Sequence, residues 1–278
     1  MFWKRVLTAV LLIPPLLAAL RFLPPAPVAV LFGIAILLAA MELSRLLPIA
    51  SAGGRALYIF VILVLGAGGS GAALYGLPGV VGTLAAATVW WSYLCFHYLF
   101  SREPLGGVFA STAGKLITGV VVLAPAWISF VFLFVQDSSS PLLLVYLLVL
   151  IWVADSAAYL VGRSIGRHKL APLVSPGKTV EGAVGALLAS ALVAAAAGLW
   201  LWHFRGSVLL AWIVLGLVTA AVSIVGDLTE STFKRIAGVK DSGTLLPGHG
   251  GMFDRIDALT AAGPVFGLGW LLLQKVAQ

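Results

Sequence analysis

The residues most suited to catalysis or metal binding in this sequence lie between Gly226 and Asp257. This segment contains five acidic residues, four basic residues and one histidine, and it contains no cysteine. If helices pass through its two ends, Asp227 and Glu230 share one helical face, and Asp254 and Asp257 share another. Carboxylates without cysteine suit a hard, oxygen-binding ion such as Mg²⁺ rather than Zn²⁺. The segment therefore predicts a divalent-metal site, provided that the chain between its ends folds back.

Four basic side chains in the same segment would surround such an ion with positive charge. These are Lys234, Arg235, Lys240 and Arg255. A divalent ion bridges phosphate oxygens and offsets charge that develops at phosphorus, so the combination predicts phosphoryl or nucleotidyl transfer. Gly248, Gly250 and Gly251 would let the backbone approach a phosphate closely. His249 is a candidate phosphate donor or proton-transfer group, and a loop histidine bonded to backbone is the alternative.

A second polar segment lies upstream and predicts a phosphate-binding loop. Ser175 and Thr179 offer hydroxyls, Lys178 offers a point charge, and the helix expected after them offers free N–H groups. The Gly-Lys-Thr sequence here is not a P-loop, because the first glycine and a preceding strand are missing. An ordinary capped loop with Glu181 in the first helical turn is the alternative. Asp155 lies in the preceding apolar run, where an unpaired carboxylate would cost several kcal/mol.

The overall composition requires these segments to sit in a membrane protein. Of the 278 residues, 61% are hydrophobic and 10% are charged, and the mean hydropathy is +1.10. Soluble domains are about 45–50% apolar and about 25% charged. This difference excludes a disordered chain, a nucleic-acid-binding module and a water-soluble enzyme. We expect residues 1–278 to form a single polytopic, all-α membrane domain.

Nine apolar runs predict nine transmembrane helices, each about 20 residues long. They span roughly 6–23, 27–47, 56–75, 78–100, 116–136, 141–162, 182–202, 208–227 and 257–274. Fourteen of the 17 Lys and Arg residues fall at the N-terminus or in the even-numbered connections. Because cytoplasmic loops collect basic residues, this bias predicts a cytoplasmic N-terminus and places both polar segments on the cytoplasmic side.

The two polar segments resemble those of the phosphatidate cytidylyltransferases, also called CDP-diacylglycerol synthases. The resemblance covers about residues 150–265, whereas the N-terminal half is similar only in hydropathy. One departure is Gly177, where many members carry a second lysine. Every fixed position of the family signature is present, as Ser231-Thr232-Phe233-Lys234-Arg235, Lys240-Asp241, Pro247-Gly248-His249-Gly250-Gly251 and Asp254-Arg255-Ile256-Asp257.

This resemblance implies a reaction in which phosphatidic acid and CTP give CDP-diacylglycerol and pyrophosphate with Mg²⁺. A monovalent cation such as K⁺ would occupy a second site. By analogy, Asp227 and Asp254 would bind metal, with Asp257 and Lys240 completing the catalytic set. The substrate phosphates would contact Ser175, Lys178, Thr179, Lys234, Arg235, His249 and Arg255.

The resemblance also implies a bacterial-type inner membrane location, a site that faces the cytoplasm, and contact with membrane lipids. It allows a homodimer. We expect residues 1–140 to support the catalytic helices and loops of residues 141–278.

Four other functions are compatible with parts of the sequence. A transporter could use Asp155 in an ion path, but the polar residues gather at one face of the membrane. A lipid kinase, or a cytidylyltransferase acting on another lipid, is closer in chemistry. A passive membrane scaffold explains the hydropathy but leaves the two polar segments without a role.

Overall fold

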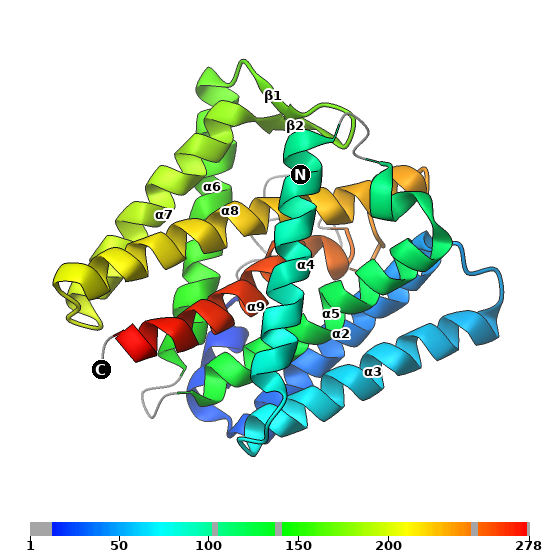
Figure 1. Ribbon diagram of the computed structural model, residues 1–278. Coiled ribbons are helices and arrows are strands. Elements are labelled where there is room, and N and C mark those ends of the chain that lie inside the picture. Colours follow the sequence, from blue (N-terminus) through cyan, green and yellow to red (C-terminus); the bar gives the residue numbers. More distant parts are fainter. Residues whose placement is uncertain (1–12, 102–104, 137–140, 246–249, 277–278) are drawn as a thin grey trace.

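The described part of the chain is a bundle of long helices with one short β-hairpin. The computed structural model describes residues 13–101, 105–136, 141–245 and 250–276 (Figure 1). A helix over Ile13–Phe22 precedes the labelled elements. These are α2 (Pro25–Leu46), α3 (Ala52–Leu74), α4 (Val80–Phe100), η1 (Gly107–Ala110), α5 (Thr112–Val135), α6 (Leu142–Ile165), β1 (Lys169–Ala171), β2 (Ser175–Thr179), α7 (Val180–Trp200), α8 (Gly206–Ile236) and α9 (Phe253–Val276).

Within the described residues, eight helices, α2 to α9, are long and apolar enough to cross a membrane. The prediction of an all-α polytopic membrane protein is therefore confirmed. The predicted first span, 6–23, falls partly outside the described residues, and its described part is the short helix Ile13–Phe22. The total of nine spans and the cytoplasmic N-terminus remain predictions.

Two helices extend beyond the apolar runs that predicted them, and both extensions carry site residues. Helix α8 continues to Ile236 rather than ending near residue 227, and α9 begins at Phe253 rather than near residue 257. In α8, every side chain from Leu228 to Lys234 is buried. The buried hydroxyls of Thr229 and Thr232 donate to carbonyl oxygens one turn earlier, at 2.8 and 2.9 Å. Such internal bonds let a polar stretch continue as a buried helix.

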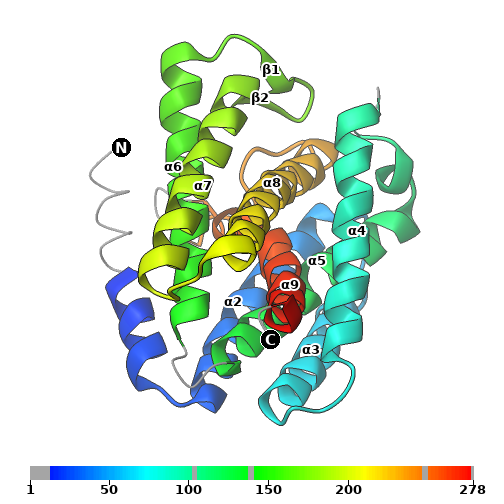
Figure 2. The same ribbon diagram turned by 60° about the vertical axis from the view of Figure 1, so that its left-hand side comes forward.

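The predicted polar loop after α6 contains a β-hairpin that the sequence analysis did not predict. Strand β1 pairs antiparallel with β2, with Lys169 opposite Thr179 and Ala171 opposite Ser175. Figures 1 and 2 both show this hairpin beside the C-terminal half of α8. The hairpin thus brings the first polar segment toward the second.

Helix α9 occupies the centre of the bundle (Figure 2). It packs against α8, α5, α4, α6 and α2. On its α5 side, Gly263 leaves space for Ser129 and Phe130. Because five helices contact α9, its position depends on the N-terminal half of the chain as well as on α6 and α8.

The N-terminal helices pack around Trp127 of α5, and glycines make this packing possible. The indole Nε1 donates to the carbonyl oxygen of Ala29 in α2 at 2.8 Å. A Cβ atom added at Gly33 or Gly66 would overlap the indole ring, whereas one added at Gly68 would meet no atom within 4 Å. Close contact of α2 and α3 with the indole ring therefore requires glycine at positions 33 and 66.

We expect Gly66→Ala to destabilise the protein by about 1–3 kcal/mol, the usual cost of overpacking a core. The measurement is the midpoint of thermal unfolding in detergent, followed by tryptophan fluorescence. Gly68→Ala is the matched control on the same helix and should leave the midpoint unchanged or raise it, since alanine favours helix. Equal midpoints for the two variants would contradict the packing around Trp127.

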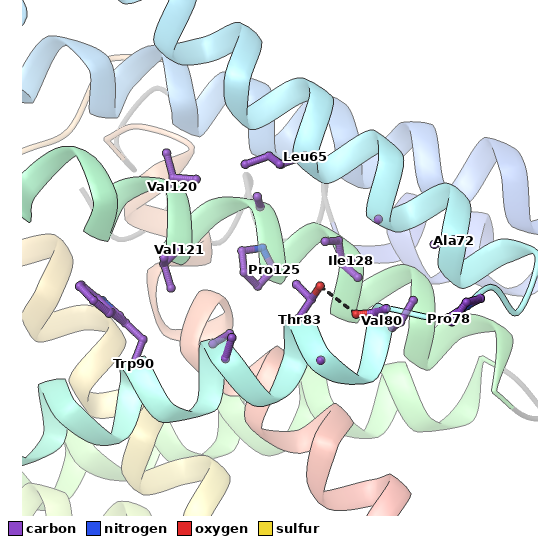
Figure 3. Close-up of a pocket in the computed structure, with 16 residues that line it drawn as sticks. Leu65, Ala72, Pro78, Val80, Thr83, Trp90, Val120, Val121, Pro125 and Ile128 are labelled. Atoms are coloured by element: carbon purple, nitrogen blue, oxygen red, sulfur yellow. Dashed lines mark hydrogen bonds between the residues drawn. The ribbon is translucent and has the colours of Figure 1, made fainter. Parts of the chain in front are cut away.

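An apolar cavity of about 700 Å³ lies between α3, α4 and α5. Figure 3 shows Leu65, Trp90, Pro125 and Ile128 at its walls, with the Thr83 hydroxyl donating to the carbonyl oxygen of Gly79 just before α4. The residues that line it are uncharged, and they belong to neither polar segment. This cavity is therefore distinct from the site that the charged residues build.

Candidate active site

The two polar segments meet through an ion pair between Lys178 and Asp227. Lys178 Nζ at the end of β2 lies 2.8 Å from Asp227 Oδ2 in α8. A second link joins the segments further along α8, where Arg235 Nε donates to the carbonyl oxygen of Val174 at 3.1 Å. The hairpin that carries β2 is therefore fixed to the part of α8 that extends beyond its apolar run.

Three carboxylates from two helices converge beside this ion pair. Oxygen atoms of Asp227 and Glu230 in α8 and of Asp257 in α9 lie within 4.8 Å of one another. The continuation of α8 places Glu230 one turn after Asp227, and the early start of α9 places Asp257 in its second turn. Glu230 is 1% exposed, and its Oε1 has no hydrogen-bond partner among the described residues. This donor set could hold a hard divalent cation.

Lys234 lies between this cluster and a fourth carboxylate. Its Nζ is 2.5 Å from Glu230 Oε2 and 2.6 Å from Asp254 Oδ1. All three side chains are largely buried, with 11%, 1% and 8% of the Lys234, Glu230 and Asp254 side chains exposed. Lys234 thus balances the charge of two buried carboxylates, in addition to any contact with substrate.

Asp254 is surrounded by hydrogen-bond donors. Its Oδ2 accepts from the Ser242 N–H at 3.0 Å and from the Gly251 N–H at 2.7 Å, and it shares the single hydroxyl hydrogen of Ser242, at 2.9 Å, with Glu42 Oε2. Its Oδ1 faces Lys234. The structure therefore places Asp257 in the carboxylate cluster with Asp227, and it places Asp254 beside Glu230 and Lys234.

In the first polar segment, Lys178 contacts the carboxylate cluster, and Thr179 begins a helix. Thr179 Oγ1 accepts from the Gly182 N–H at 3.1 Å and so caps α7. Glu181 in the first turn lies 2.6 Å from His168 Nδ1. This capping matches the alternative for the helix start, and Thr179 is buried. Ser175 pairs with Ala171 in the hairpin.

Of the remaining candidates, the structure describes Arg235, Lys240, Arg255 and Asp155. Arg235, Lys240 and Arg255 have exposed side chains, and Asp155 of α6 is also exposed. The charges of Asp227, Lys178 and Arg255 act on Asp155, so it belongs to the same charged region. His249 lies outside the described residues, as do the neighbouring Pro247 and Gly248.

One residue that contacts this region was missed by the sequence analysis, and it comes from the N-terminal half. Glu42 of α2 is 6% exposed and accepts hydrogen bonds from Ser242, Met252 and Phe253. The signal was available, because Glu42 is an acidic residue inside an apolar run, as Asp155 is.

Clustered carboxylates beside buried and half-buried lysines, at the end of membrane-spanning helices, are typical of membrane enzymes that act on phosphate groups. Comparison with known proteins narrows this class. The sequence profile of the Cytidylyltransferase family matches residues 3–272. The chain belongs to this family.

Several curated proteins of this kind are similar to the chain. A phosphatidate cytidylyltransferase of Pseudomonas aeruginosa is 42% identical over 267 residues, covering 96% of each chain. One from Haemophilus influenzae is 52% identical over 130 residues, 45% of this chain and 44% of that protein. One from Staphylococcus aureus is 41% identical over 159 residues, 55% of this chain and 58% of that protein. The resemblance inferred from the motifs is confirmed, and it extends into the N-terminal half.

Proposed function

We propose that this chain is a phosphatidate cytidylyltransferase, which forms CDP-diacylglycerol and pyrophosphate from CTP and phosphatidic acid. The observation that carries the proposal is the cluster of Asp227, Glu230 and Asp257 beside Lys178, in a chain of this family. In the reaction, a phosphate oxygen of the lipid bonds to the α-phosphorus of CTP. The bond from that phosphorus to the oxygen bridging toward the β-phosphorus breaks, and pyrophosphate leaves with the electron pair.

The carboxylate cluster fits a bound Mg²⁺. Three carboxylate oxygens lie within 4.8 Å of one another, and the buried Glu230 Oε1 lacks a hydrogen-bond partner among the described residues. Asp227, Asp257 and Glu230 would hold the ion, which when bound would neutralise phosphate charge. Asp254 would bind the same ion through carboxylate lone pairs that its contact with Lys234 leaves open. A monovalent cation such as K⁺ at a second site remains part of the proposal.

The chain's own residues would bind and orient the two phosphates. Lys178 is suited to this role because its side chain is 24% exposed while it pairs with Asp227, so it can reach a ligand without leaving the cluster. Arg235, Lys240 and Arg255 have exposed side chains and would hold the triphosphate or the lipid phosphate. The Ser175 and Thr179 hydroxyls and His249 are proposed as further phosphate donors.

The proposed topology places this chemistry where both substrates are available. The lipid keeps its tails in the bilayer with its phosphate at the surface, and CTP is cytosolic. A cytoplasmic site in a bacterial-type inner membrane would serve both, and the distribution of basic residues supports that orientation. A homodimer is compatible with the proposal.

The position of a radioactive label tests this function against its closest rivals. With phosphatidic acid and Mg²⁺, purified protein should incorporate label from CTP labelled at the α-phosphorus into lipid, and none from CTP labelled at the γ-phosphorus. EDTA should abolish incorporation, and added Mg²⁺ should restore it. Transfer of the γ-label would indicate a lipid kinase. Uptake of solute by sealed vesicles without CTP would indicate a transporter.

A further inference from the structure

The carboxylate of Glu42 receives three hydrogen bonds from the chain around the start of α9. Its Oε1 accepts from the Met252 N–H at 2.9 Å, and its Oε2 accepts from the Phe253 N–H at 2.8 Å and the Ser242 hydroxyl at 3.0 Å. Glu42 lies near the C-terminal end of α2, which ends at Leu46. It is 6% exposed. A buried carboxylate is costly unless it is bonded in this way, so the contact is specific.

The contact with Glu42 acts as an N-terminal cap for α9. The first N–H groups of a helix have no acceptor within the helix, and a carboxylate there also interacts favourably with the helix dipole. Here the Gly251 N–H donates to Asp254, while the Met252 and Phe253 N–H groups donate to Glu42. A side chain from α2 thus caps the helix that carries Asp254 and Asp257.

Glu42 also joins the two sides of the loop between α8 and α9. Ser242 lies within this loop and Phe253 is the first residue of α9, and both donate to Glu42 Oε2. Ser242 in turn donates through its backbone N–H to Asp254 Oδ2 at 3.0 Å. A displacement of Glu42 would therefore reach Asp254 through a single intervening residue.

Two glycines between α8 and α9 leave space for the Glu42 side chain because they have no Cβ atom. A Cβ atom added at Gly243 would lie 2.6 Å from Glu42 Oε1 and 2.9 Å from its Cδ. One added at Gly251 would overlap both Glu42 Oε2 and the Ser242 hydroxyl. Backbone that approaches a carboxylate this closely requires residues without a side chain.

We propose that Glu42 is a positioning residue for cytidylyl transfer, because it fixes the start of α9 and with it the carboxylates of Asp254 and Asp257. The inference rests on the proposed function. The N-terminal half of the chain would then contribute to catalysis, because Glu42 of α2 fixes the position of α9.

Substitutions at Glu42 test the inference directly. Glu42→Ala should lower kcat per folded molecule by about 10- to 100-fold, as loss of an outer-shell partner does. Glu42→Gln should lie between Glu42→Ala and the wild type, because its amide oxygen can still accept one backbone N–H. Ser44→Ala is the matched control, since the Ser44 hydroxyl is buried in the same helix and bonds to Met41 O. Its kcat should match the wild type.

Hydrogen exchange separates a positioning role from a general loss of packing. In Glu42→Ala, peptides containing Met252 and Phe253 should exchange faster, while peptides of α3 and α5 keep their protection. If kcat per folded molecule is unchanged, or if exchange rises equally throughout the bundle, Glu42 does not position α9.

A double-mutant cycle with Gly243→Ala gives a second test that does not depend on Glu42→Ala alone. Gly243→Ala should lower kcat in the wild-type background, where the new methyl group meets Glu42, and should cost little more in the Glu42→Ala background. Full additivity would contradict the contact. If Glu42→Ala fails to fold, Glu42→Ser takes its place in the cycle, because serine also removes the carboxylate that the methyl group would meet. A wild-type protein that does not make CDP-diacylglycerol would overturn the proposed function, while the exchange experiment would still report on the Glu42 contact.

Discussion

Replacing Asp257 with Asn is expected to lower turnover on the order of 1,000-fold while the helical bundle stays folded. The variant keeps the size and shape of the side chain but removes one of the three charges that would hold Mg²⁺. A metal contributes several kcal/mol to the stabilisation of a phosphoryl transition state, and each 1.36 kcal/mol is a factor of ten in rate. Asp227→Asn should have a similar effect.

Thermal unfolding distinguishes loss of the ion from loss of the fold. Mg²⁺ should raise the unfolding midpoint of the wild type, because a ligand that binds the folded state stabilises it. This shift should vanish in Asp257→Asn. Without Mg²⁺, the midpoint should hold or rise, since one of three neighbouring like charges is gone. Thr219→Val is the control, because the Thr219 hydroxyl bonds to Leu215 O earlier in α8, and it should keep both turnover and shift.

The same measurements of turnover and of the unfolding midpoint show whether Asp254 binds the metal ion. If Asp254 is a metal ligand, as the family resemblance implies, Asp254→Asn loses the Mg²⁺-dependent shift. If Asp254 serves instead to hold Lys234 and the loop, Asp254→Asn lowers the midpoint and retains the shift. Near-normal turnover in both Asp227→Asn and Asp257→Asn would end the assignment of metal to this cluster.

Helical periodicity was sufficient to predict much of the site within single helices. The spacing of Asp227 and Glu230 placed them on one face of a continued helix, and α8 does continue through them. Hydropathy located α2 to α9 to within a few residues at most ends. Both predictions use information that lies within one helical segment, where the backbone geometry is fixed.

Contacts between segments could not be predicted in the same way. Glu42 and Ser242 are 200 residues apart in the chain, and their contact depends on how α2 packs against α9. Likewise, the three-residue spacing of Asp254 and Asp257 puts both on one face of α9. Only the position of Lys234 and of the Ser242 N–H shows that Asp254 turns toward donors while Asp257 joins the cluster.

Lys234→Met is expected to unfold the site rather than merely weaken substrate binding. The substitution leaves the carboxylates of Glu230 and Asp254, 1% and 8% exposed, without the ammonium group that lies between them. Removing one partner of a buried ion pair costs about 3–5 kcal/mol, because the remaining charge stays buried. The unfolding midpoint should therefore fall sharply, and turnover should be lost.

A second substitution tests this explanation. In Lys234→Met/Glu230→Gln, one of the two uncompensated charges is also removed, so part of the lost stability should return while turnover stays absent. Lys275→Met, at the exposed end of α9, is the control for removal of a lysine charge and should leave the midpoint unchanged. If Lys234 instead serves only to bind a substrate phosphate, Lys234→Met would keep the wild-type midpoint and raise the KM for CTP. The two outcomes differ in stability as well as in kinetics, so the role of Lys234 can be decided even if the variant has no measurable turnover.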